Sequence, residues 1–96
     1  MAKEYKDLVV GLDIGTSKIM VVVAEVQPGG VLDSQAHEPG SREHLSVLSG
    51  SLEVTAQGLT SKLKAGETAR YAVDGPHTIR NSAKSAATAL LVVLHP

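Results

Sequence analysis

The chain has 96 residues, with nine lysines and arginines against ten aspartates and glutamates, and a formal net charge of -1 when its four histidines are neutral. This length allows one domain with a single apolar core, and the charge excludes the basic face that nucleic acid or an anionic membrane requires. The absence of cysteine excludes disulfides and thiolate metal sites.

The composition also argues against targeting segments and base stacking. The N-terminal sequence MAKEYKDL is charged where a signal peptide needs an apolar core, and the longest apolar runs are far shorter than a membrane span. Two tyrosines are the only aromatic residues, too few to stack single-stranded bases. We therefore expect a cytoplasmic protein that binds neither nucleic acid nor membrane.

The first predicted element is a β-hairpin within residues 8–26. Leu8–Asp13 and Ile19–Val26 are rich in valine, which favours strands, and GTSK between them is the expected turn. The second stretch is apolar on both faces, so we expect a buried strand in which Glu25 reaches solvent or a partner.

Short strands separated by turns are predicted next. Leu45, Val47, Leu52 and Val54 alternate with polar residues, which is the pattern of half-buried strands. The turn-forming groups are Pro28-Gly29-Gly30, Pro39-Gly40-Ser41, Ser49-Gly50, Gln57-Gly58, Ala65-Gly66 and Asp74-Gly75-Pro76. These groups divide the chain into segments too short for most helices.

The C-terminal segment predicts a central strand. ALLVVLHP, residues 89–96, is apolar on both faces, whereas SAKSAATAL before it lacks the apolar stripe of a helix and is expected to be a turn. Many short strands at a spacing of roughly eight to twelve residues indicate an all-β sandwich or barrel.

Two motifs after Gly30 resemble those of the cupin family of small barrels. They are GGVLDSQAHEPGSREHLSVLSG and GETARYAVDGPHTIRN, and the similarity is strongest to the ligand-sensing cupin at the C-terminus of helix-turn-helix transcription regulators. The residues at the family's spacing are His37, Glu43, Gly50, Gly66, His77 and Asn81. The resemblance implies a cupin-like jelly-roll barrel whose leading strands come from the N-terminal hairpin.

The same resemblance implies a metal site. Its ligands would be His37, Glu43 and His77, and the cofactor a divalent metal (Fe, Mn, Ni or Zn), because imidazole and carboxylate suit such ions. Pro39, which has no donor atom, stands where the family has a second histidine. His44 is no substitute, because it follows Glu43 directly and consecutive strand residues point to opposite faces.

Structural roles compete with the metal interpretation. The two histidines could instead line a polar pocket or bond to the backbone at strand ends. Glu43 could be a pocket carboxylate that pairs with His77 or Arg70, and Asn81 is expected to fix a turn through its side chain. No catalytic residue is predicted.

Residues 8–26 resemble the N-terminus of the bacterial cell-division actin homologue, an actin-like ATPase. The resemblance implies that Asp13 holds a magnesium-bound water and that the glycine turn forms an anion-binding nest. Its cofactor-binding residues would be Asp13, Gly15, Thr16, Ser17 and Lys18. Because no second phosphate loop follows Gly30, we favour an ordinary hairpin over a nucleotide site.

Two unrelated resemblances meet near residues 26–30, which suggests a chimaera, natural or de novo. We expect a single domain over 1–96, made of an actin-homologue-like hairpin (1–29) and a cupin core (30–96). A hairpin that did not evolve with its barrel leaves an open sheet edge. We therefore predict a homo-oligomer, formed through that edge or by exchange of the N-terminal hairpin.

Three functions stay open. The favoured one is a binding module for a small molecule, or at most a metal, without turnover. The alternatives are a metal-dependent cupin enzyme (isomerase or oxygenase) and a nucleotide-binding fragment that uses the DIGTSK loop.

Overall fold

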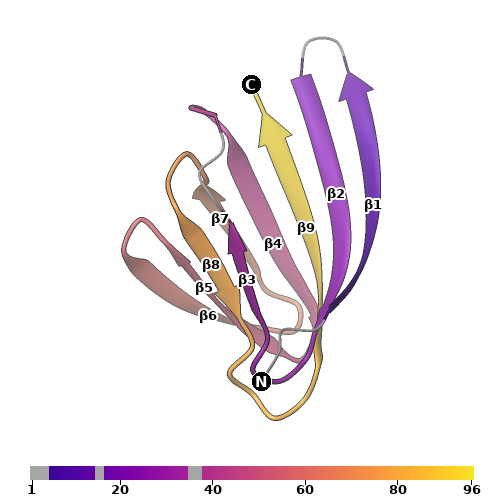
Figure 1. Cartoon of the computed structure of the whole chain (residues 1–96), viewed down its shortest axis with the longest axis vertical. Helices are drawn as coiled ribbons and strands as arrows, with labels where there is room; N and C mark the ends of the chain where they lie inside the picture. Colours follow the sequence, from indigo (N-terminus) through magenta and orange to yellow (C-terminus); the bar gives the residue numbers. More distant parts are fainter. Residues whose placement is uncertain (1–4, 15–16, 35–37) are drawn as a thin grey trace.

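The computed structural model describes residues 5–14, 17–34 and 38–96. Within them, nine strands form two antiparallel sheets that face each other, one of five strands and one of four (Figure 1). The five-stranded sheet contains, in spatial order, β1 (Tyr5–Ile14), β2 (Ser17–Val26), β9 (Ala87–His95), β4 (Arg42–Ser49) and β7 (Thr68–Ala72). The four-stranded sheet contains β3 (Val31–Ser34), β8 (His77–Arg80), β5 (Ser51–Ala56) and β6 (Leu59–Lys64). The all-β prediction is confirmed.

In this part of the chain, no helix is long and apolar enough to cross a membrane. The predicted cytoplasmic location stays a prediction. SAKSAATAL, residues 82–90, forms no helix, as predicted, but only its first part is a turn, because β9 begins at Ala87.

The N-terminal hairpin belongs to the five-stranded sheet. β1 and β2 pair from Tyr5↔Val26 to Ile14↔Ser17, and β2 then pairs with β9 from Lys18↔His95 to Val26↔Ala87. β2 and β9 are thus both central strands, as expected from their apolar runs. The hairpin prediction is confirmed, and the hairpin supplies leading strands to the fold, but Ser17 and Lys18 of the expected GTSK turn belong to β2.

The apolar core lies between the sheets. Leu45 and Val47 of β4 meet Leu52 and Val54 of β5, and all four side chains are buried, which confirms the alternation expected for these strands. The other buried members of the cluster are Val26, Leu63, Ile79, Ala87 and Ala89. Several of these side chains are small, so valine, leucine, isoleucine and alanine fill the space between the sheets, and the chain has no phenylalanine or tryptophan.

Asn81 ties the two sheets together at the end of β8. Its side chain is fully buried and donates to the carbonyl oxygens of Val26 and Ser85, each at 2.9 Å, while its own oxygen accepts from Ala83 N at 2.9 Å. The end of β2 is thereby attached to the turn before β9. The predicted turn-fixing role of Asn81 is confirmed.

The outer face of β2 and β9 is apolar. Their inward residues alternate with Ile19, Val21 and Val23, which pair in register with Leu94, Val92 and Leu90. Val23 is 36% exposed, and β1 beside it forms the open edge of the sheet. An open edge next to an apolar face is a site of association between chains.

We predict that the self-association expected from the sequence uses this outer face and its β1 edge. Val23→Glu should place a charge on the face and shift the protein to a monomer of 10.0 kDa, whereas wild-type protein should elute at a larger mass. Size-exclusion chromatography with light scattering measures both masses. Thr60→Glu, an exposed position on the other sheet, is the control and should leave the mass unchanged. A strictly monomeric wild-type protein at high concentration contradicts the prediction.

Candidate functional site

Three polar side chains meet between the sheets. Glu43 in β4 and Tyr71 in β7 are paired in register, and His77 comes from the start of β8 in the facing sheet. The Tyr71 hydroxyl donates to Glu43 Oε2 at 2.5 Å, and His77 Nε2 lies 3.6 Å from Glu43 Oε1. Glu43 and His77 are each 3% exposed. We call Glu43, Tyr71 and His77 the buried polar cluster.

Burial determines the chemistry of this cluster. A carboxylate removed from water is costly unless it is hydrogen-bonded, and Tyr71 supplies that bond to Glu43. Burial raises the pKa of the Tyr71 phenol, and the negative charge of Glu43 and the hydrogen bond to it raise that pKa further. The phenol therefore stays protonated and acts as a donor.

The histidine is oriented by the backbone. His77 Nδ1 lies 3.1 Å from the carbonyl oxygen of Gly75. Since a carbonyl only accepts, Nδ1 must carry the proton, and Nε2 is the nitrogen turned toward Glu43. Of the two partners expected for Glu43, His77 is the correct one. Arg70 pairs in register with His44 on the opposite face of β4, as the strand periodicity predicts for His44.

The metal prediction is met only in part. The fold brings Glu43 and His77 together, whereas His37 lies outside the described residues. Among the residues that are described, no three His, Asp or Glu side chains are placed to hold a metal ion. Catalytic metal sites generally use three protein ligands. These residues alone therefore do not fit a metal, and the set with His37 stays a prediction.

The phosphate-loop prediction is untested. Gly15 and Thr16 lie outside the described residues. Asp13 and Lys18 are paired in register near the end of the β1–β2 hairpin, and Ser17 pairs with Ile14. The backbone of these three residues is thus part of an antiparallel ladder.

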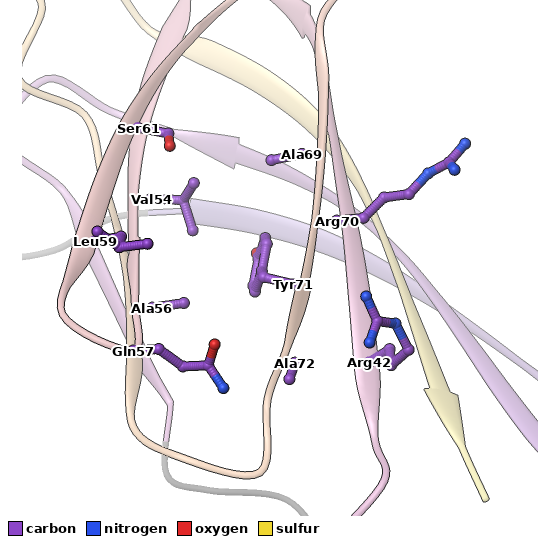
Figure 2. Close-up of a pocket in the computed structure, with 10 residues that line it drawn as sticks. All are labelled: Arg42, Val54, Ala56, Gln57, Leu59, Ser61, Ala69, Arg70, Tyr71 and Ala72. Carbon is purple, nitrogen blue, oxygen red and sulfur yellow. The ribbon is translucent and has the colours of Figure 1, made fainter.

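A pocket opens beside the buried polar cluster, between the edge strands β6 and β7 (Figure 2). Its volume is about 310 Å³. The lining residues are Arg42, Val54, Ala56, Gln57, Leu59, Ser61, Ala69, Arg70, Tyr71 and Ala72. Tyr71 belongs both to the pocket wall and to the cluster, so its hydrogen bond to Glu43 holds one wall of the pocket in place.

The sequence patterns indicate no pocket, although three of its residues have other predicted roles, Val54 in a strand, Gln57 in a turn and Arg70 as a candidate partner of Glu43. Alternation could have placed Ala69 and Tyr71 on the inward face of one strand. However, it could not pair that strand with β4, whose Glu43 lies 28 positions earlier.

A second cluster joins Glu38, Ser41 and His95. Ser41 Oγ lies 3.4 Å and Glu38 Oε1 lies 3.5 Å from the same atom, His95 Nδ1. A nucleophilic triad needs the serine and the carboxylate at different imidazole nitrogens. This cluster is therefore not arranged for nucleophilic catalysis.

We predict that Tyr71→Phe lowers the free energy of unfolding near neutral pH by about 1–3 kcal/mol, because Glu43 Oε2 loses its donor. The substitution should also change how the free energy of unfolding depends on pH. The pKa of Tyr71 is raised above its ordinary value of 10.0 in the folded protein, so the phenol contributes stability that is full below about pH 10 and is lost above it.

Wild-type stability should therefore fall more steeply above pH 10 than that of Tyr71→Phe, by up to about 1.4 kcal/mol per pH unit. Urea unfolding between about pH 8 and pH 11 measures both slopes. Tyr5 is present in both proteins and cancels in the comparison. Parallel pH profiles would disprove the assignment.

The chain matches the family of cupin domains named Cupin_2 over residues 22–93. It is 35% identical over 57 residues to the HTH-type transcriptional regulator SutR of Escherichia coli (strain K12), covering 59% of this chain and 32% of that protein. The chain thus spans about a third of that relative's length.

Two solved structures have the same fold. The Cupin_2 domain of an XRE family transcriptional regulator from Enterobacter cloacae is 30% identical, with a TM-score of 0.78 and coverage of 94% of this chain and 96% of that one. An HTH_3 family transcriptional regulator from Vibrio cholerae is 21% identical, with a TM-score of 0.78 and coverage of 94% and 51%. The actin-like resemblance and the chimaera inferred from it find no support in these comparisons. The chain belongs to the Cupin_2 family of cupin domains.

Proposed function

We propose that this cupin domain is a binding module that takes a small organic molecule into the pocket beside Tyr71, without turnover. The observation that carries the proposal is the pocket itself. Its volume of about 310 Å³ lies at the lower end of the range of ligand sites. Val54, Ala56 and Ala69 form an apolar wall, and a few polar groups stand around it. This is the usual composition of a small-molecule site.

The chemistry of the lining favours binding over catalysis. Among the described lining residues there is no histidine, aspartate or glutamate to act as a general base. Tyr71 is the one acid among them, and its raised pKa keeps its proton in place. Glu43 lies behind Tyr71, bonded to the phenol, rather than among the lining residues.

The relatives suggest where such a module works. Those compared above are transcriptional regulators by name, and this chain covers about a third of one of them (32%). We infer a sensor role, in which occupancy of the pocket is passed to another part of a longer protein. The chimaeric origin is supported only by the sequence of residues 8–26, as is the nucleotide-binding alternative.

We predict that filling the pocket abolishes binding. Ala56→Phe places a ring against Val54 and Tyr71, whereas Thr55→Phe places the same ring on the outer face of the same strand. The probes are benzamide, benzoate and benzylammonium. Their binding to the wild-type protein and to both variants is measured from changes in backbone amide chemical shifts. The best probe should bind wild-type and Thr55→Phe with a Kd on the order of 1 mM, and Ala56→Phe at least about tenfold more weakly. If none of the three shifts the pocket amides of wild-type protein saturably, the proposal fails.

The metal-dependent enzyme, an isomerase or oxygenase, is the alternative that makes a different prediction. Since the described cluster supplies two donors, we expect less than one equivalent of metal per chain after mild purification. Elemental analysis of wild-type, His77→Ala and His44→Ala proteins checks this. Stoichiometric iron, manganese, nickel or zinc that is lost only in His77→Ala would favour the enzyme, because His44 lies on the opposite face of β4.

A further inference from the structure

We propose that the pocket selects a small organic anion, a carboxylate or similar acid on an apolar body, and that Arg42 and Gln57 bind its charged group. This inference rests on the proposed binding function and adds the chemical class of the ligand. It depends on three features of the pocket mouth: the placement of Arg42, the charge of the lining, and the backbone of Gln57.

Arg42 reaches the pocket across a small neighbour. It pairs in register with Ala72 of the edge strand β7, and the methyl side chain of Ala72 leaves room for the longer arginine to extend toward the mouth. Arg42 shares the outer face of β4 with His44 and lines the pocket from its rim. In Figure 2 its guanidinium lies over its own strand, close to Ala72, whereas that of Arg70 extends away from the pocket. The two arginines therefore differ in role although both border the site.

The charge of the lining has one sign. It includes two arginines and, among the described residues, no carboxylate. Within the described residues, the carboxylates that lie close to a basic nitrogen are Glu43, beside His77, and Glu38, beside His95, so neither arginine at the pocket has a carboxylate partner there. An arginine without a carboxylate partner at a pocket mouth favours an anion, since guanidinium binds carboxylates in bidentate geometry.

Gln57 is held in an unusual conformation. With Gly58 it forms the two-residue turn between β5 and β6, with φ of 53° and 76° respectively. Both values being positive identifies a type I′ turn, for which asparagine, aspartate or glycine is preferred at the first position. Figure 2 shows the Gln57 amide directed toward Ala72, which Arg42 flanks on the other side. The longer glutamine thus places an N–H donor at the mouth where the preferred residues of the turn would not reach.

The apolar body of the ligand has its own surface. Val54, Ala56 and Ala69 provide the inner wall, and Leu59 at the mouth is 74% exposed. A ring or short hydrocarbon bound to the wall would cover Leu59 while its acid group meets Arg42. The pocket thus separates an apolar half from a cationic rim, which matches an amphipathic acid.

Benzoate and benzamide test this inference, because they have the same shape and differ in charge. By chemical shift titration at low salt, benzoate should bind at least about tenfold more tightly than benzamide. Arg42→Gln should abolish this preference while leaving benzamide affinity unchanged, and Arg70→Gln should retain it. Gln57→Asn should raise the melting temperature, since the turn prefers asparagine, and yet weaken benzoate binding several-fold.

The outcomes distinguish the two proposals. Equal affinity for benzoate and benzamide, or tighter binding of benzylammonium, overturns the anion proposal and leaves the binding module standing. Loss of the benzoate preference in Arg70→Gln but not in Arg42→Gln also overturns it. If none of the probes binds, both proposals fall together.

Discussion

The buried carboxylate of Glu43 is the constraint on which the site depends. Moving an ionised carboxylate out of water costs several kcal/mol unless hydrogen bonds replace the lost hydration. Tyr71 from β7 meets that need directly, and His77 from the facing sheet lies against the other oxygen. One polar group thus relates β4 to β7 and β8, and its partner Tyr71 follows it by 28 residues in the sequence. Other apolar side chains of similar volume could replace those of the core around Leu45 and Leu52. Glu43, in contrast, requires neighbours that donate hydrogen bonds to its carboxylate.

This constraint also shapes the pocket. Because the Tyr71 hydroxyl is held by Glu43, its ring has a fixed position in the wall beside Ala69 and Ala56. A rigid wall reduces the entropy lost when a ligand binds. The polar groups at the mouth, by contrast, stand on a turn and on the rim of a sheet, so the charge recognition that we propose is separated from the rigid interior.

The sequence predicts much of the fold because local patterns carry it. Alternation of Leu45 and Val47 places β4, and the both-sided apolar run of ALLVVLHP places β9 in the centre of its sheet. The turn-fixing role of Asn81 follows from its side-chain chemistry, because its amide both donates and accepts hydrogen bonds. These features depend on residues close together in the chain.

The site is less predictable because it depends on register between distant strands. The pairing of Glu43 with Tyr71 follows only when β4 and β7 are adjacent and correctly aligned. For the same reason the sequence left Arg70 and His77 as equal candidates for Glu43, although the fold places Arg70 opposite His44, away from the buried cluster. Motif spacing could not indicate the pocket mouth, since Arg42 lies within the first motif and Gln57 within a turn group, and neither pattern shows that the fold brings the two residues to one pocket.

Tyr71 also shows how the buried carboxylate of a cupin fold can be hydrogen-bonded when one histidine of the family's motif is missing. Pro39 removes one donor that the family's motif supplies, and the Tyr71 hydroxyl occupies Glu43 Oε2 at 2.5 Å. A metal ion held by Glu43 Oε1 and His77 Nε2 would leave the Tyr71 hydrogen bond to Oε2 in place, and the phenol would then orient the ligating carboxylate. The hydrogen bond from Tyr71 therefore satisfies one of the two carboxylate oxygens, and His77 faces the other. In the described residues it is Tyr71 that satisfies Oε2, and the binding proposed for the pocket beside it depends on the shape and the cationic rim of that pocket.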